Sequence, residues 1–331
     1  MDFFPAHRDT LVCLLAGGAG ERLMPLTRDR AKPAVPFGGI YRIVDITLSN
    51  CINSDLRRMF VITQYKALSL NRHIREGWSG LPSELGEFIQ VLPPQMRVGE
   101  HWYRGTADAI FQNLYSIGSE ACKYVLLLSG DHVYKMNYQL MLKQHIDSGA
   151  DVTIGALVFD LAEASRFGVC EVDHDHRIVG WQEKPENPKP SPDNPQKALV
   201  SMGIYCFNRD LLIQALLEDA EDADSSHDFG KNVIPKLIER ARVFSYQFHD
   251  ENEKDAQYWR DIGTIEAYYE ANMDLVSVSP VFNLYDGHWP IRTYQRQYPP
   301  AKFVFAQEGR RMGIAVDSIV SSGCIISGGR V

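Results

Sequence analysis

The feature that most constrains the fold of this chain is the alternation of short apolar segments with segments of helical period. The apolar segments are TLVCLLAGG, RRMFVITQY, KYVLLLSGDH, DVTIGALV and LVSMGIYCF, which begin at residues 10, 57, 123, 151 and 199. Helical patterns lie between them at residues 106–117 and 137–148, and Gly149 follows the second at a C-cap position. Strands that are apolar on both faces are typical of a mostly parallel sheet covered by helices, so we predict an α/β fold.

Composition and charge exclude several classes of protein. The 331 residues are 45% hydrophobic and carry a formal net charge of -8, so the chain can bury a large core but lacks the broad basic surface of a nucleic-acid or membrane binder. The six cysteines form no CxxC pair and several lie in apolar runs, which indicates reduced, mostly buried thiols rather than disulfides or a zinc site. No apolar run approaches membrane-spanning length, and we expect a cytoplasmic protein.

The C-terminal part of the chain follows a different pattern. Residues 277–300 are rich in proline and aromatic residues without a regular period, which indicates a connection that leaves the main domain. Beyond it, Ile319, Ile325 and Val331 recur every six residues, a spacing typical of a β-helix. We expect a main domain over residues 1–276, a linker over residues 277–313 and, over residues 314–331, the beginning of a truncated β-helix.

Two polar segments are predicted to be surface features. DHDHR at residues 173–177 has the residue types of a metal cluster, but it lies between two strand-like runs where a hairpin turn is expected. The acidic segment EDAEDADSS at residues 218–226 is interpreted as a solvated stretch.

A glycine-rich segment follows the first predicted strand. Gly17, Gly18 and Gly20 come directly after Leu15, where glycine lets consecutive backbone N–H groups surround an anion without interference from a Cβ. The spacing does not complete the G-x-G-x-x-G pattern of dinucleotide-binding folds, and no G-K-[ST] follows as in a P-loop. On glycine alone, a tight strand-to-helix turn remains the simpler interpretation.

Two basic residues near these glycines favour a binding site. Arg22 follows the glycines, and Lys32 precedes Pro33, which is expected to bias the lysine toward an extended backbone. An arginine supplies a forked contact and a lysine a point charge beside the backbone amides. The segment is therefore predicted to hold a polyphosphate.

At this point the motifs identify a family. AGGAGERLMPLT, AKPAVPFGG, HWYRGTADAIFQN, LLSGDHVYKM, EKP, SMGIYCF, SSHDFGKNVIP and YWRDIGTIEAYYEANMDL resemble, in this order, the motifs of the sugar-phosphate nucleotidylyltransferases. The closest likeness is to the branch that makes ADP-glucose for glycogen and starch synthesis. The resemblance covers nearly the whole chain and implies a Rossmann-like, mostly parallel mixed sheet in a catalytic domain, followed by a left-handed parallel β-helix.

The implied reaction is the attack of glucose 1-phosphate on the α-phosphorus of ATP, which gives ADP-glucose and pyrophosphate without an enzymic nucleophile. Arg22, Lys32 and Asp131 are the residues expected to serve catalysis. Asp131 ends an apolar strand, where α/β sheets expose ligand groups, and Asp261 occupies a second strand-to-turn position. Two carboxylates beside phosphate oxygens suit Mg²⁺, and the resemblance makes both residues its ligands.

The resemblance also assigns the two substrate sites. The ATP side takes the glycines at 17, 18 and 20 together with Gln64, Tyr103, Gly105, Thr106 and Ala107, the last three at the start of a helix whose N-terminal amides favour negative charge. The glucose 1-phosphate side takes Tyr103, Gly168, Glu183, Lys184 and Ser201, with Asp228 in support. Glu183 and Ser201 suit sugar hydroxyls, and Lys184 suits the phosphate.

Assembly and regulation follow from the resemblance alone. Members of this family are commonly homotetramers under the control of small anionic effectors, bound between the catalytic domain and the β-helix. Asp29 stands where some bacterial relatives carry a basic residue for the activator, while Arg30 and Arg42 remain as anion ligands. Two alternatives stay open: transfer of another nucleotide, from dTTP, UTP or GTP, and a catalytically silent regulatory subunit.

Overall fold

The computed structural model describes residues 5–18, 20–95, 102–191, 194–307 and 311–331; Ala19 of the glycine-rich segment and His101 of the HWYRGT motif lie outside these ranges. Its strands are β1 Thr10–Leu15, β2 Pro36–Phe37, β3 Tyr41–Arg42, β4 Arg58–Ile62, β5 Phe88–Leu92, β6 Tyr124–Ser129, β7 His132–Tyr134, β8 Val152–Asp160, β9 Gly168–Val172, β10 Ile178–Glu183, β11 Lys197–Asn208, β12 Val243–Gln247, β13 Trp259–Asp261, β14 Lys302–Val304 and β15 Ile325–Ser327. Its α-helices are α1 Ile43–Asn53, α2 Leu68–Gly77, α3 Thr106–Phe111, α4 Leu114–Ser119, α5 Tyr138–Asp147, α6 Arg209–Glu221, α7 Ile234–Ile238 and α8 Ile265–Asp274.

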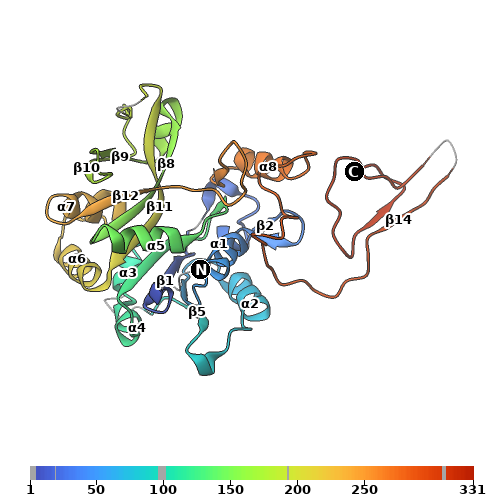
Figure 1. The fold of residues 1–331 in the computed structure, drawn as a ribbon. Helices are drawn as coiled ribbons and strands as arrows, with labels where there is room; N and C mark the ends of the chain where they lie inside the picture. The colour runs from blue at the N-terminus through green and yellow to red at the C-terminus, as the bar shows by residue number, and fades with distance from the viewer. Residues whose placement is uncertain (1–4, 19, 96–101, 192–193, 308–310) are drawn as a thin grey trace.

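One mixed sheet runs through the main body (Figure 1). Within the described residues its path is β10-β9-β11-β6-β1-β4-β5, and β8 pairs with both β11 and β12. The strands β6, β1, β4 and β5 are parallel neighbours, as are β8 and β12, whereas β11 is antiparallel to β6, β8 and β9. The predicted fold class is confirmed, but the parallel order ends at β11. Next to β11, β9 and β10 form a further antiparallel pair, joined by a short turn that only antiparallel strands allow.

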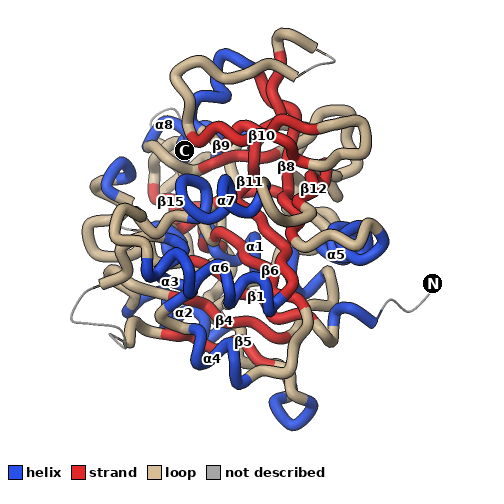
Figure 2. Tube along the Cα trace, turned by 90° about the vertical axis from the view of Figure 1, so that its left-hand side faces the viewer, coloured by secondary structure: helices blue, strands red, loops and turns tan. Residues whose placement is uncertain are grey.

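Helices cover both faces of this sheet (Figure 2). Val12 and Leu14 of β1 pack in one cluster with residues of α1, α2 and α5. Their neighbours Leu11 and Cys13 point the other way and pack with residues of α3, α6 and α7. Because successive strand residues face opposite sides, this apolar run builds two cores at once, as the sequence predicted.

The two predicted helices have different outcomes. Residues 137–148 form α5, whose N-cap Asn137 accepts a hydrogen bond from the Gln139 N–H at 3.0 Å, and Gly149 follows with a positive φ of 60°. Residues 106–117 are not one helix, because the chain turns between α3 and α4. There the Asn113 side chain donates to the Ala109 carbonyl at 2.8 Å, an alternative to regular helical bonding.

The predicted surface segments also differ in outcome. Residues 173–177 form the turn between β9 and β10, as expected. The acidic segment at 218–226 is not simply solvated: it begins inside α6, and Asp219 is buried against His227. All six cysteines are free, four of them buried, which agrees with the expectation of reduced thiols.

The C-terminal segment projects away from the main body (Figure 1). The strands β14 and β15 pair in parallel, and Ile314 bridges Arg330, so successive turns of chain stack on one another. The strand β14 lies within the range predicted as linker. Across the described part of the chain, no helix is long and apolar enough to cross a membrane.

A buried carboxylate, that of Asp45, holds the extended segment after α8 against the main domain. Asp45 on α1 is fully buried and accepts hydrogen bonds from the Arg42 N–H at 2.8 Å and from the Trp78 indole at 2.9 Å. His73 Nε2 and Thr293 Oγ1 each lie 2.6 Å from its carboxylate oxygens. One side chain therefore joins α1, the end of α2 and the extended segment after α8.

We expect Asp45→Ala to lower the free energy of unfolding by about 3 kcal/mol or more, because its buried donors lose their acceptor. Urea unfolding followed by circular dichroism measures this change. Asp29→Ala is the matched control, since the Asp29 side chain is 71% exposed, and it should shift stability by no more than about 0.5 kcal/mol. Equal stability of the two variants would refute the role given to Asp45.

Candidate active site

A cleft of about 720 Å³ opens along the carboxyl ends of the parallel strands. Gly17 and Gly18 follow β1, Gln64 follows β4 and Asp131 follows β6, and all four residues line the cleft. Because parallel strands end at a common edge, residues from three distant segments meet there. The cleft is therefore where the sequence predicted a binding site.

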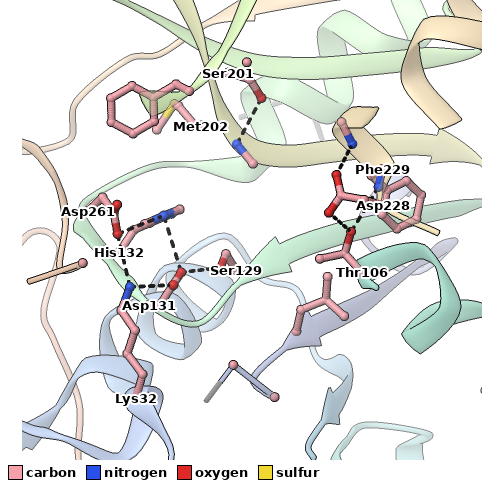
Figure 3. Close-up of a pocket in the computed structure, with 18 of the residues that line it drawn as sticks. Lys32, Thr106, Ser129, Asp131, His132, Ser201, Met202, Asp228, Phe229 and Asp261 are labelled. Carbon is pink, nitrogen blue, oxygen red and sulfur yellow. Dashed lines mark hydrogen bonds and ion pairs between the residues drawn. The ribbon is translucent and has the colours of Figure 1, made fainter. Parts of the chain in front are cut away.

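The centre of the cleft is a lysine held by two carboxylates (Figure 3). Lys32 Nζ donates to Asp131 Oδ2 at 2.7 Å and to Asp261 Oδ1 at 3.2 Å. Ser129 Oγ also donates to Asp131 in a short hydrogen bond. Asp261 reaches this place because β13 pairs antiparallel with β7, which sets Asp261 opposite His132.

The charges in this cluster stabilise one another. Burial alone would lower the pKa of Lys32, but the carboxylates of Asp131 and Asp261 outweigh it and raise the pKa above its ordinary value. Burial would likewise raise the pKa of Asp131, but Lys32 and His132 hold it well below its usual range. Both groups are thus charged around neutral pH.

His132 is a site residue that the sequence pattern did not predict. Its Nε2 lies 3.4 Å from Asp131 Oδ1 and 3.9 Å from Asp261 Oδ1. One potential ligand atom from each of these three residues lies within 4.8 Å of the others, a spacing that fits a divalent cation. The position of His132 directly after Asp131 was the sequence signal that could have identified it.

The backbone of Lys32 differs from the prediction. Instead of being extended, Lys32 begins the 3-10 helix η3, Lys32–Ala34, and the extended residue is Ala31 before it. Proline restrains the preceding residue only as a bias, and Pro33 fits here because it lies in the first turn of η3, where its missing N–H is not needed. Arg22 also lines the cleft, beside Gly263, so both predicted cations face the carboxylates.

Most residues predicted for ATP line one half of the cleft. Gly17, Gly18, Gln64, Tyr103, Gly105 and Thr106 are among them. A Cβ at Gly17 would lie 3.0 Å from Gln64 Cβ, whereas a Cβ at Gly18 would meet nothing within 4 Å. Gly20 does not line the cleft. With a φ of 65°, it shapes the turn that leads into Arg22.

Ala107 does not meet its prediction. It is fully buried outside the cleft lining, and its N–H donates to the His227 carbonyl at 2.8 Å. The Asp108 N–H points to the same carbonyl at 3.4 Å. The amides of Ala107 and Asp108 are thus used within the protein and do not face an anion.

The other half of the cleft holds the residues predicted for the sugar phosphate. Gly168, Glu183, Lys184 and Ser201 all line it. A Cβ at Gly168 would lie 2.4 Å from the Trp181 ring, so only glycine fits there. Lys184 has a positive φ of 46°, and its Nζ lies 3.1 Å from Glu183 Oε1.

Several lining residues of this half were not predicted from the sequence. They are Arg166, Phe167, Trp181, Met202, Gly203, Tyr205, Phe229, Gly230 and Trp259. Phe229 and Gly230 follow Asp228 within the HDFGK motif, and Trp259 lies two residues before Asp261, so proximity to known motifs was a usable signal. The same signal was available for the remainder. Met202, Gly203 and Tyr205 lie within the SMGIYCF motif, and the others lie within two residues of Gly168 or Glu183.

Comparison with known proteins agrees with this arrangement. A family model described as nucleotidyl transferase matches residues 11–278, and one described as GlmU-like, C-terminal hexapeptide, matches residues 299–331. The glucose-1-phosphate adenylyltransferase of Koribacter versatilis is 66% identical over 98% of this chain and 78% of its own length. That of Rhodopirellula baltica is 59% identical over 99% of this chain and 74% of its own, and glucose-1-phosphate adenylyltransferase 2 of Alkalilimnicola ehrlichii is 56% identical over 97% and 76%.

The chain belongs to the nucleotidyl transferase family. Within that family, the extent of its identity to named relatives places it with the glucose-1-phosphate adenylyltransferases. The resemblance seen in its motifs is thereby confirmed, and the hexapeptide match confirms the expected beginning of a β-helix.

Asp131→Asn is expected to weaken binding of Mn²⁺, an EPR-visible divalent cation, by roughly tenfold or more, because one charged ligand is lost. Titration of free Mn²⁺ by EPR measures the affinity. Asp147→Asn is the control. It neutralises a carboxylate on α5 whose side chain is 57% exposed, and it should leave the Mn²⁺ affinity unchanged. Equal Mn²⁺ affinity in the Asp131 variant and the wild type would remove this residue from the metal site.

Proposed function

We propose that the chain transfers AMP from ATP to α-D-glucose 1-phosphate, giving ADP-glucose and pyrophosphate for glycogen or starch synthesis. One observation carries the proposal: a single cleft is lined by the glycine-rich segment after β1, by Glu183 and Lys184, and by the cluster of Lys32, Asp131 and Asp261. The named activity of relatives that are 54% to 66% identical along nearly the whole chain supports the choice of substrates.

The reaction needs alignment and charge neutralisation more than covalent chemistry. A phosphate oxygen of glucose 1-phosphate attacks the α-phosphorus of ATP in line, and the bond to the bridging oxygen of pyrophosphate breaks. Arg22 and Lys32 are positioned to neutralise the leaving pyrophosphate, the former as a fork and the latter as a point charge. No serine, cysteine or other side chain is assigned as a nucleophile.

The acidic cluster fits Mg²⁺. Carboxylate oxygens are the ligands this ion prefers, and Asp131 and Asp261 offer them within reach of each other. When bound, the ion supplies positive charge to the phosphate oxygens. Lys32 neutralises the same carboxylates through direct hydrogen bonds.

The ligand assignments follow the two halves. For ATP we propose the backbone at Gly17 and Gly18 with Gln64, Tyr103 and Gly105. For glucose 1-phosphate we propose Gly168, Glu183, Lys184 and Ser201, with Tyr103 at the boundary. The buried, free cysteines support a cytoplasmic location, and we propose a homotetrameric assembly with it. The main domain is proposed to end at residue 276, and the C-terminal unit is proposed to begin before residue 313, because β14 at Lys302–Val304 already pairs with β15.

A second cleft supports control by small anions. It has a volume of about 530 Å³ and lies between the main body and the C-terminal segment, where Arg42, Arg72 and Arg296 line it together with Ser321. Burial is the main cause that lowers the pKa of Arg42, and the charge of Arg30 lowers it further. Asp29 does not line this cleft, and we propose that an anionic effector binds the three arginines instead.

Pyrophosphate release tests the function directly. The full chain is incubated with Mg²⁺, glucose 1-phosphate and, in turn, ATP, dTTP, UTP or GTP, and we expect the highest turnover with ATP. A higher rate with another nucleotide would reassign the specificity. Nucleotide binding without any pyrophosphate release would identify a silent regulatory subunit.

Lys184→Ala is expected to raise the KM for glucose 1-phosphate roughly tenfold or more, with a smaller change in kcat, because it removes a charge that binds the phosphate in the ground state. Steady-state kinetics with varied glucose 1-phosphate measures both constants. Lys189→Ala, on the same loop and paired with Glu171, serves as the control. A large loss of kcat at unchanged KM would instead place Lys184 at the reacting phosphorus.

A further inference from the structure

The segment before η6, the π-helix Phe229–Val233, joins the two halves of the cleft. Thr106 Oγ1, at the first position of α3 on the ATP side, donates to Asp228 Oδ2 at 3.2 Å. The same hydroxyl accepts a hydrogen bond from the Phe229 N–H at 3.1 Å. Figure 3 shows Thr106 reaching up between Asp228 and Phe229. A side chain from one half is therefore fastened to the backbone of the other.

The fastened segment supports the sugar side. The other oxygen of Asp228 accepts from the Gly230 N–H at 3.0 Å and from the Lys231 N–H at 3.2 Å, which sets the first turn of η6. Glu183 lies directly against that turn, since a Cβ at Gly230 would come within 2.4 Å of Glu183 Oε2. A displacement of η6 toward Glu183 would therefore push the Glu183 carboxylate out of place.

The segment is also anchored from behind. His227 and Asp219 form a buried pair, with 2.9 Å between Nδ1 and Oδ2. The His227 carbonyl receives the Ala107 N–H, and a Cβ at Gly105 would lie only 2.2 Å from that carbonyl oxygen. The base of the segment is held by these buried contacts, while its tip at Asp228 is bonded to Thr106, an exposed residue.

Hydrogen-bond counting decides what Thr106 can do. A hydroxyl has one donor, and that donor is used by Asp228. A polyphosphate offers acceptors only, so the side chain has no donor left for it. The Thr106 hydroxyl is therefore unsuited to donate a hydrogen bond to the phosphates of ATP, although it lies on the ATP side.

We propose that Thr106 is a positioning residue for glucose 1-phosphate: through Asp228 and η6 its hydroxyl holds Glu183 in place for the sugar. This inference rests on the proposed function, because it takes the Glu183 half of the cleft as the sugar site. It separates two roles within one residue, since the backbone of Thr106 belongs to the ATP half and its hydroxyl serves the other.

Calorimetric titration of the full chain with Mg²⁺ tests the proposal. Two affinities are measured: that of α,β-methylene-ATP alone, and that of glucose 1-phosphate with this unreactive nucleotide saturating. Thr106→Val keeps the branched shape and the backbone, and we expect glucose 1-phosphate to bind roughly tenfold more weakly while the nucleotide changes less than about twofold. Thr106→Ser retains the hydroxyl and should bind both ligands like the wild type.

Three results would overturn the proposal: unchanged glucose 1-phosphate affinity in Thr106→Val, an equal loss for the nucleotide, or a serine variant that behaves like valine. Asp222→Asn is the control, because its carboxylate lies just before this segment and pairs with Lys236 instead. It should leave both affinities unchanged, and a loss as large as that of Thr106→Val would also count against the proposal. Wild-type pyrophosphate release is measured in the same preparation, so an inactive wild type reports failure of the proposed function separately.

Discussion

The ion pairing of Lys32 with Asp131 and Asp261 is the interaction on which the rest of the site depends. It joins residues 99 and 229 positions apart in the sequence, in a place where an unpaired charge would be costly. The parallel strands bring the first carboxylate to the sheet edge, and the pairing of β13 with β7 brings the second. Two anionic substrates that bind at this point would therefore meet charged side chains that are already in position.

Around that centre, the walls of the cleft are built by close approach of backbone and side chains. At Gly105 a carbonyl, at Gly168 an indole ring and at Gly230 a carboxylate occupy the space that a Cβ would need. These three glycines let neighbouring groups approach the backbone closely, whereas Gly20 allows a turn with positive φ. The distinction matters for substitution, because alanine at the first three would displace neighbours that line or support both halves of the cleft.

Some predicted elements follow local sequence signals, and others are changed by tertiary contacts. The helix at 137–148 was predicted well because its cap, its period and its terminal glycine are all local signals. The helical pattern expected at 106–117 forms two short helices, because the chain turns at residues 112 and 113, where the Asn113 side chain bonds to the Ala109 carbonyl. Ala107 shows the limit of local signals, since its N–H donates to the carbonyl of His227, a residue distant in sequence.

What the sequence determined by itself is the alternation of apolar strands with helices, the glycine turn after β1 and the identity of the family, because each is carried by contiguous residues. The motifs also supplied the cleft residues at the strand ends, such as Gly17, Gln64 and Asp131, whereas many other lining residues were not predicted. Only the tertiary structure placed His132 beside two carboxylates, tied Thr106 to Asp228 and buried Asp219 against His227. Strand pairing and loop packing create these contacts, and their energies depend on residues that no local pattern brings together.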